Sequence, residues 1–408
     1  MVENTPVTTV QPSRPRRTRR RRLRRFGIGL LIAVVLLGGG SILATRLAHL
    51  PSPVMLAKLE LTAPSRQGDL FPARTLPASG TPVEFGSGSA ALPDDVPWKG
   101  RRVSLDDFLS TTHSKALVVL RDGRLVQEWY AAGVTPQTRM SSWSVAKSVV
   151  SLMIGQAIGR GDLAETDRLV DLVPALRSGN RYDDITVRDL LDMTAGVDVS
   201  ENYNAYWPFT GTARMFLTTD LPGFLGEHRR VTFEPGSRGD YLSVNTQLLG
   251  TILAAVEKRP LAELASDWIW SPSGAQSSAT WNLDRDHGTE KSFCCLNATA
   301  LDFAHIGQLV LDGGKVGDTQ VVPAAWITRL ATPAAHQVSD WGYSAQWWHA
   351  PGGRSNDYSA IGIYGQYIYV NPTTRTVVVK LSDHGTEQDE QETIDVLRTL
   401  AGEDPTLP

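Results

Sequence analysis

The stretch SSWSVAKSVV, residues 141–150, places a single lysine among serines and apolar residues. Ser144 and Lys147 form an S-x-x-K pattern, and residues three apart share one face of an α-helix. Helical signals run from about residue 144 to 160. We therefore expect a serine hydroxyl beside a lysine amine at a helix start, where the helix dipole favours a developing oxyanion. An ordinary helix start with a lysine reaching solvent gives the same pattern, so the rest of the chain has to decide.

A second candidate group lies in FEPGSRGDYLSVNTQLLG, residues 233–250, where Tyr241 follows a loop signal and precedes a predicted helix over 245–259. A phenol beside a lysine is a candidate general base, because neighbouring positive charge favours the phenolate. Further on, AIGIYGQYIYV, residues 360–370, carries two glycines in a strand pattern. Glycine inside a strand often marks a close backbone approach, and an N–H there predicts a second oxyanion donor.

The remaining patterns predict the fold class. Residues 116–133 read as two apolar strands around Asp122-Gly123, and residues 365–383 read as a second antiparallel hairpin. Amphipathic helices are expected between these hairpins, including one over 297–314. Strands at both ends with helices between them predict an α+β domain, with an antiparallel sheet built from both ends and an inserted helical region.

Taken in order, S-x-x-K, Y-x-S and the glycine-containing late strand resemble the serine β-lactamase and penicillin-binding-protein superfamily over roughly residues 100–402. The chain looks most like the class C type, and within it the esterase-like group that includes 6-aminohexanoate-dimer hydrolase. The resemblance implies a β-lactamase/transpeptidase-like fold. It also implies that Ser144 is the nucleophile, Lys147 its helical partner and Tyr241 the tyrosine of the second motif.

The resemblance implies further site residues. The backbone N–H groups of Ser144 and Ile363 would hold the oxyanion. Ser243 takes the third position of the second motif, and Tyr203, in SENYNAYW, resembles a tyrosine on a loop that closes over the pocket. Both are weaker candidates for substrate binding, and Tyr203 also fits a surface loop.

One departure from the superfamily bears on the substrate. Where β-lactamases and transpeptidases begin the late strand with Lys-Thr-Gly or His-Thr-Gly, this chain has AIG at residues 360–362. The missing cation would otherwise hold a substrate carboxylate, so we expect a neutral small-molecule ester or amide, cleaved through an acyl-enzyme without cofactor or metal. The alternatives are a true β-lactamase or D-alanyl-D-alanine carboxypeptidase, and a penicilloyl-binding sensor without turnover.

The N-terminal segment predicts a membrane location. Residues 1–25 hold nine arginines and one glutamate, and residues 26–45 carry no charge. Twenty such residues match the thickness of a bilayer core, and the flanking charges would leave the catalytic domain on the extracytoplasmic side. A cleaved signal peptide and a twin-arginine signal are the alternatives. Because a membrane span explains the arginines, no nucleic-acid partner is expected.

The domain plan follows from these segments. Residues 46–100, rich in Pro, Gly and Ser, are expected to form a linker and lead-in. The hydrolase domain is expected over 101–402, and residues 403–408 as a tail. The two cysteines, Cys294 and Cys295, are adjacent. Bonded neighbours are rare, so we expect two reduced, buried side chains.

Overall fold

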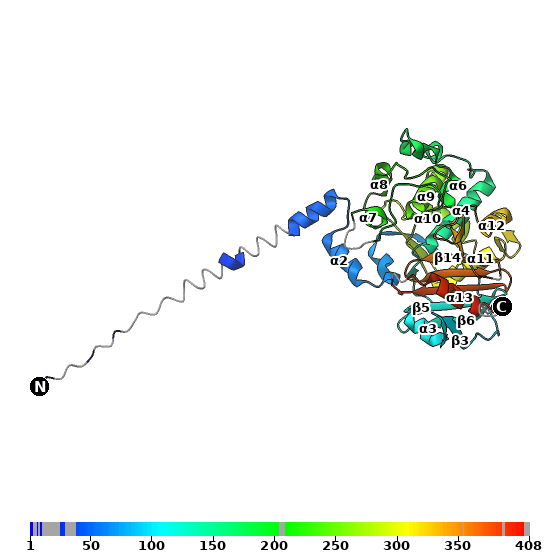
Figure 1. The fold of residues 1–408 in the computed structure, drawn as a ribbon, viewed down its shortest axis with the longest axis horizontal. Coiled ribbons are helices and arrows are strands. Elements are labelled where there is room, and N and C mark those ends of the chain that lie inside the picture. Colours follow the sequence, from blue (N-terminus) through cyan, green and yellow to red (C-terminus); the bar gives the residue numbers. More distant parts are fainter. Residues whose placement is uncertain are drawn as a thin grey trace. The chain divides into compact units, whose positions relative to one another are not determined.

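The computed structural model describes residues 1–2, 6, 9, 25–28, 38–203, 209–353, 355–385 and 388–403. The chain divides into two compact units, Met1–Leu56 and Ala57–Pro408. Figure 1 colours the chain along its sequence. Within the first unit, residues 38–47 are helical.

The membrane anchor predicted over residues 26–45 is wrong. In the described ranges, every helix is too short or too polar to cross a membrane. This finding contradicts the predicted membrane-anchored location. Residues 29–37 of the segment, residues 10–24 of the arginine-rich tail and residues 404–408 of the C-terminal tail lie outside the described residues.

The second unit is organised around an eight-stranded sheet with the strand order β12-β13-β14-β15-β16-β5-β6-β2. Neighbouring strands are antiparallel, except that β2 and β6 pair in parallel. The strands are β2 (Gly86–Ser87), β5 (Ser114–Arg121), β6 (Arg124–Tyr130), β12 (Gly342–Ser344), β13 (Trp347–His349), β14 (Tyr358–Gly362), β15 (Gln366–Asn371) and β16 (Thr376–Ser382).

Two hairpins form the centre of this sheet, and both were predicted from the sequence. Asp122 and Gly123 join β5 to β6 with φ values of 50° and 71°, the positive values that a two-residue type I′ turn requires. The second hairpin consists of β15 and β16, and β16 also pairs along β5. The C-terminal strands therefore lie beside the N-terminal strands, which confirms an α+β sheet built from both ends of the domain.

Most of the helices cover the sheet or fill the inserted region between β6 and β12, and α2 precedes the sheet in the sequence. They are α2 (Pro53–Leu61), α3 (Leu105–Thr111), α4 (Val145–Arg160), α5 (Leu169–Leu172), α6 (Val187–Leu191), α7 (Gly211–Leu217), α8 (Leu221–Glu227), α9 (Ser243–Glu257), α10 (Leu261–Ala265), α11 (Ala300–Leu311), α12 (Ala324–Leu330) and α13 (Glu390–Leu400). Short helical turns are η1 (Pro64–Leu70), η2 (Pro174–Leu176), η3 (Arg181–Asp184) and η4 (Ser266–Trp270).

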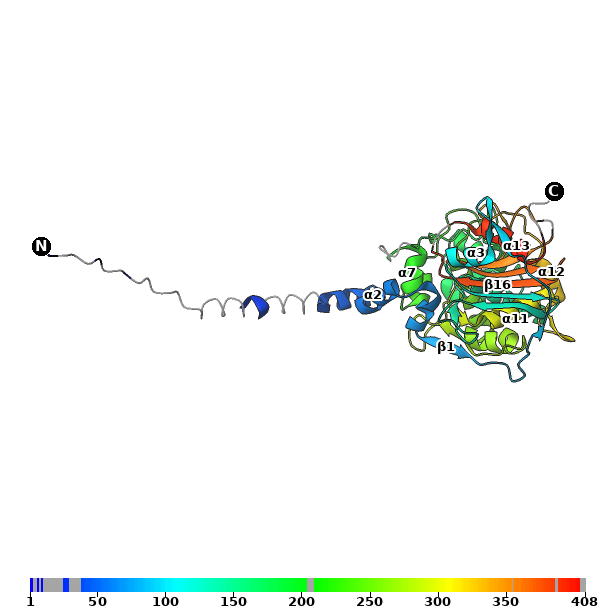
Figure 2. The same ribbon diagram turned by 90° about the horizontal axis from the view of Figure 1, so that it is seen from below.

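Alternating side chains of the central strands face two separate cores. On β16, Val377 and Val379 join the large core that contains residues of α4 and α11, whereas Val378 faces the smaller core under α3 and α13. This period of two is expected for a strand that is buried on both faces. Figure 2 shows α11 on one side of β16, and α3 and α13 on the other.

A smaller, four-stranded sheet supports the segment that precedes α4. Its order is β1-β8-β9-β7, and the Leu296 carbonyl accepts a hydrogen bond from Ser142 N at 2.8 Å, just beyond the end of β7. The strands are β1 (Ala73–Leu76), β7 (Met140–Ser141), β8 (Ala279–Asn282) and β9 (Leu296–Ala298), and two further pairs are β3 (Asp95–Trp98) with β4 (Arg101–Ser104) and β10 (Lys315–Val316) with β11 (Thr319–Gln320).

Part of the predicted lead-in packs against the domain. Ser65 N donates to Asp383 Oδ1 at 2.7 Å, and Gly68 N donates to Ser141 Oγ at 3.1 Å. These bonds tie η1 to Asp383, just after β16, and to Ser141 of β7, three residues before Ser144.

Candidate active site

Ser144 stands at the start of α4, where the chain turns sharply. The preceding residue, Trp143, has φ +47°, a conformation that costs a non-glycine residue of order 1–3 kcal/mol. Its indole Nε1 donates to the Pro64 carbonyl at 3.2 Å, which holds the turn. In α4, which is described throughout, the Ser144 side chain caps no backbone N–H. The hydroxyl is therefore left for Lys147.

Lys147 is 1% exposed and lies directly behind the serine. Its Nζ is 2.7 Å from Ser144 Oγ and donates to the Phe293 carbonyl at 2.8 Å. Burial lowers the pKa of Lys147 to about 7, and the negative charge of Glu201 opposes that shift. Much of the lysine is therefore neutral near pH 7, and a neutral amine at this distance can accept the serine proton.

Tyr241 completes the group from the other side. Lys147 Nζ lies 5.2 Å from the centroid of its ring, and the ring stacks on Trp348 at a centroid distance of 5.2 Å. Burial raises the pKa of Tyr241 well above its usual value, the charge of Glu201 adds to that, and a hydrogen bond with Ser144 opposes it. Burial thus outweighs the positive charge that was expected to favour a phenolate, and Tyr241 rests as a protonated phenol.

The end of β14 approaches the nucleophile closely, as the strand glycines predict. A Cβ atom on Gly362 would lie 2.7 Å from the Ser142 carbonyl oxygen and 3.0 Å from Ser144 N, so only glycine fits. Ile363 follows immediately and lines the same cavity as Ser144. The end of β14 therefore lies against the turn that presents Ser144, and the Ile363 N–H stays the predicted second oxyanion donor.

The cavity in front of Ser144 has a volume of about 560 Å³. None of the described residues that line it is a lysine or an arginine, whereas three are carboxylates. The lining residues are Ser144, Glu201, Tyr203, Tyr241, Ser339, Trp341, Trp348, Ile361, Gly362, Ile363, Tyr364, Gly365, Tyr367, His384, Gly385, Gln388, Asp389 and Glu390.

Tyr203 and Ser243 meet at Glu201, a carboxylate that the sequence did not single out. Glu201 accepts hydrogen bonds from Ser243 N at 2.7 Å, from Ser243 Oγ at 2.6 Å, from Thr212 Oγ1 at 2.9 Å and from the Tyr203 hydroxyl. Tyr203 lines the cavity, whereas Ser243 is fully buried and supports Glu201 instead. The only sequence signal for Glu201 is its place two residues before Tyr203.

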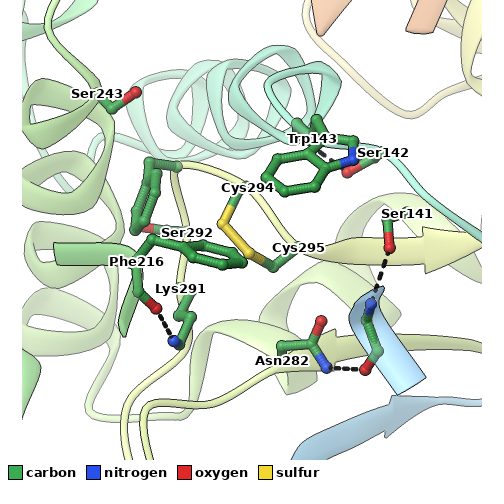
Figure 3. The surroundings of a disulfide bond; sticks show 12 residues. Ser141, Ser142, Trp143, Phe216, Ser243, Asn282, Lys291, Ser292, Cys294 and Cys295 are labelled. Carbon is green, nitrogen blue, oxygen red and sulfur yellow. Dashed lines mark hydrogen bonds between the residues drawn. A yellow bond between two sulfur atoms is a disulfide. The ribbon is translucent and has the colours of Figure 1, made fainter. Parts of the chain in front are cut away.

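The two cysteines form a disulfide, so the expectation of reduced side chains is wrong. The pair directly follows Phe293, whose carbonyl binds Lys147. Figure 3 shows the disulfide beside the rings of Trp143 and Phe216, with Lys291 below, whose Nζ donates to the Phe216 carbonyl. Both cysteines are almost completely buried.

The described residues contain no group of three or more His, Cys, Asp or Glu side chains that could hold a metal ion. The expectation of a reaction without metal or cofactor stays a prediction. The residues of the site can perform three steps by themselves. Lys147 can accept a proton, Ser144 can attack as a nucleophile, and backbone N–H groups can stabilise an oxyanion.

Comparisons with known proteins identify the family of the chain. A family model described as Beta-lactamase matches residues 109–402. The chain is 30% identical to 6-aminohexanoate-dimer hydrolase of Paenarthrobacter ureafaciens over 346 residues, which cover 78% of this chain and 84% of that relative.

Solved structures show the same fold. A Bacillus anthracis protein provisionally named as a 6-aminohexanoate-dimer hydrolase superposes with a TM-score of 0.73 at 22% identity, covering 86% of this chain and 93% of that one. A class C β-lactamase of Rhodobacter sphaeroides gives a TM-score of 0.55 at 16% identity, over 73% and 97% of the two chains. The predicted β-lactamase/transpeptidase-like fold is thereby confirmed, and the chain belongs to the β-lactamase family and is a serine hydrolase.

Proposed function

We propose that the chain cleaves a small-molecule ester or amide through an acyl-enzyme on Ser144, with Lys147 and Tyr241 as the proton-transfer groups. The observation that carries this proposal is the 2.7 Å distance from Lys147 Nζ to Ser144 Oγ. It joins a nucleophile to a base whose pKa burial has lowered to about 7.

Acylation starts when Ser144 Oγ attacks the substrate carbonyl carbon and its proton passes to neutral Lys147. The N–H groups of Ser144 and Ile363 hold the oxyanion that forms. Collapse of the tetrahedral intermediate expels the alcohol or amine, which takes its proton from the Tyr241 phenol. The Lys147 ammonium then returns a proton to Tyr241, so both groups recover their starting states.

Deacylation uses Lys147 as the base again, with water in place of the serine. Water attacks the acyl carbonyl and gives its proton to neutral Lys147. The ester bond to Ser144 breaks, and the serine recovers a proton from the lysine, which releases the acid product.

The cavity lining supports a substrate that needs no carboxylate clamp. No described lining residue is a lysine or an arginine, and a bidentate cation is the usual partner of a carboxylate. The relative from Paenarthrobacter ureafaciens is named for cleaving an aminohexanoate dimer, which supports linear amides as one substrate class. Tyr203 lines the cavity, which supports a role in contacting the substrate, and Ser243 donates a hydrogen bond to Glu201, which lines the same cavity.

A substrate panel tests the proposal. Wild type is assayed with p-nitrophenyl esters, 6-aminohexanoate dimer and a chromogenic cephalosporin, beside Ser144→Ala and the control Ser151→Ala, which alters another buried serine on α4. We expect ester or amide turnover in wild type and Ser151→Ala, and none in Ser144→Ala. A cephalosporin as the best substrate would favour a true β-lactamase, and stable acylation without turnover would favour a sensor. Either result would overturn the proposal.

A further inference from the structure

Both halves of the proposed catalytic pair depend on one short segment, residues 293–296. The Phe293 carbonyl accepts the hydrogen bond from Lys147 Nζ at 2.8 Å. Three residues later, the Leu296 carbonyl accepts a hydrogen bond from Ser142 N at 2.8 Å, at the turn that presents Ser144. The two residues between these carbonyls are Cys294 and Cys295, joined by the disulfide.

The backbone at the second cysteine is in an unusual conformation. Cys295 has φ +76°, in the left-handed region that residues other than glycine seldom occupy. Such conformations persist only where the surroundings determine them strongly. The ring closed by bonding two neighbouring side chains restricts the peptide between them directly, and no cysteine occurs elsewhere in the sequence.

The bonds around the disulfide hold its carbonyls but leave the Phe293 carbonyl to Lys147. Trp281 Nε1 donates to the Cys294 carbonyl at 3.1 Å, and Asn282 N donates to the Cys295 carbonyl at 2.9 Å. The Phe293 carbonyl, which binds Lys147, belongs to the peptide that leads into Cys294, so a change in the backbone at residues 294 and 295 would reach it through the chain.

We propose that the Cys294–Cys295 disulfide is a positioning element for Lys147, acting through the Phe293 carbonyl, and that its reduction by a dithiol reversibly slows the hydrolase. The inference rests on the proposed function of Lys147. In the reductive step a dithiol thiolate attacks one cysteine sulfur, the mixed disulfide resolves, and two electrons and two protons convert the S–S bond into two thiols while the dithiol becomes a cyclic disulfide.

The pH dependence of the rate separates positioning from general loosening. The Phe293 carbonyl accepts a hydrogen bond from the lysine, and an acceptor favours the charged form. Its displacement lowers the pKa of Lys147 further, so the acid limb of the kcat/KM profile moves to lower pH. If the site merely opened to water, the pKa would rise towards its ordinary value and the limb would move to higher pH.

The experiment uses the full chain in four forms: wild type, Cys294→Ala, Cys295→Ala and the double variant. Alkylation followed by intact-mass measurement counts free thiols in wild type before and after treatment with dithiothreitol. The pH profile of ester hydrolysis is then recorded for each form with and without dithiothreitol, and again for wild type after reoxidation with diamide. Thermal melts of each form check that it is folded.

We expect no free thiol in untreated wild type and two after reduction. Reduced wild type and all three variants should share a kcat about tenfold lower, the effect of one weakened hydrogen bond to a charged group, with the acid limb shifted to lower pH. Reoxidation should restore wild type, and dithiothreitol should leave the double variant unchanged.

Three results would overturn the inference: two free thiols before reduction, an unchanged rate and pH profile after it, or a slower rate without a shift of the acid limb to lower pH. All three are recorded on wild-type enzyme that is active before any reductant is added, so they leave the proposed function standing. An oxidised, folded wild type without any turnover would instead remove the proposed function, and the inference with it.

Discussion

Replacing Gly362 by alanine should damage the oxyanion hole while leaving the fold intact. The added Cβ would lie 2.7 Å from the Ser142 carbonyl oxygen and 3.0 Å from Ser144 N. Both contacts are with backbone, which cannot swing aside as a flexible side chain does. The end of β14 must therefore retreat by roughly 0.5 Å, which equals the tolerance of about 0.5 Å within which catalytic groups must be held.

The retreat carries the Ile363 N–H away from the oxyanion. Loss of one such donor lowers kcat by about 10²–10³-fold, whereas KM should change little because the donor acts mainly on the transition state. The assay is steady-state ester hydrolysis at saturating substrate, with circular dichroism and a thermal melt on the same samples. Gly226→Ala is the matched control, since a Cβ there has no neighbour within 4 Å among the described residues.

A folded Gly362→Ala protein with the kcat of wild type would refute the reasoning. It would show that β14 does not supply the second donor, or that the close approach has no part in catalysis. A loss of equal size in Gly226→Ala would point to a general sensitivity to added side chains instead.

Three further predictions concern ionisable groups. Lys147 accepts a proton only when it is neutral, and burial lowers its pKa to about 7. Wild-type kcat/KM should therefore fall as the pH drops through about 7. A pH profile of kcat/KM that stays flat down to about pH 5 would contradict this. Glu201→Gln removes a charge that raises the pKa of Lys147, so the acid limb of the kcat/KM profile should move to lower pH. The kcat should also fall about tenfold, because the hydrogen bond from Tyr203 to residue 201 weakens. An acid limb that moves to higher pH would contradict this prediction. Burial also lowers the pKa of Lys380 from 10.5 to about 7, so between these pH values the unfolded chain binds more protons than the folded chain and stability rises with pH. Lys380→Met should therefore raise the free energy of unfolding by about 2 kcal/mol at pH 7 and by less near pH 10. Urea titration against the exposed control Lys315→Met measures this, and a lower free energy of unfolding at both pH values would contradict it.

Features with a local cause could be predicted from the sequence. The proximity of Ser144 and Lys147 follows from helical spacing alone, and the structure places their side chains 2.7 Å apart. The Asp122-Gly123 turn followed from the backbone conformations that those two residues tolerate. Gly362 was recognisable because a glycine inside a strand signals a neighbouring backbone.

Features that depend on distant partners could not be predicted. Glu201 sits in a polar loop sequence, and its importance comes from Ser243 and Thr212, which reach it only in the folded chain. Tyr241 was expected to be a ready base because lysine lies near, but sequence does not measure burial, which dominates its pKa.

Two expectations failed because they rested on general statistics: how often adjacent cysteines are bonded, and the averaged hydropathy of a segment. Neither quantity describes the backbone geometry of this chain. Disulfides between adjacent cysteines are rare, which is why reduced side chains were expected. In the structure the two cysteines are bonded, and Cys295 has a positive φ of 76°. The uncharged run over residues 26–45 predicts a membrane span by its hydropathy, but hydropathy does not fix where a helix begins and ends. No helix in the described ranges meets both requirements of length and apolarity.

The most direct test of an activated Ser144 is the intact mass of the full chain after treatment with a fluorophosphonate probe, compared with Ser144→Ala treated in the same way. The account predicts one adduct on the wild-type chain, mapped by peptide analysis to Ser144, and none on the variant. A wild-type chain that stays unmodified while folded, or an adduct that persists in Ser144→Ala, would contradict it.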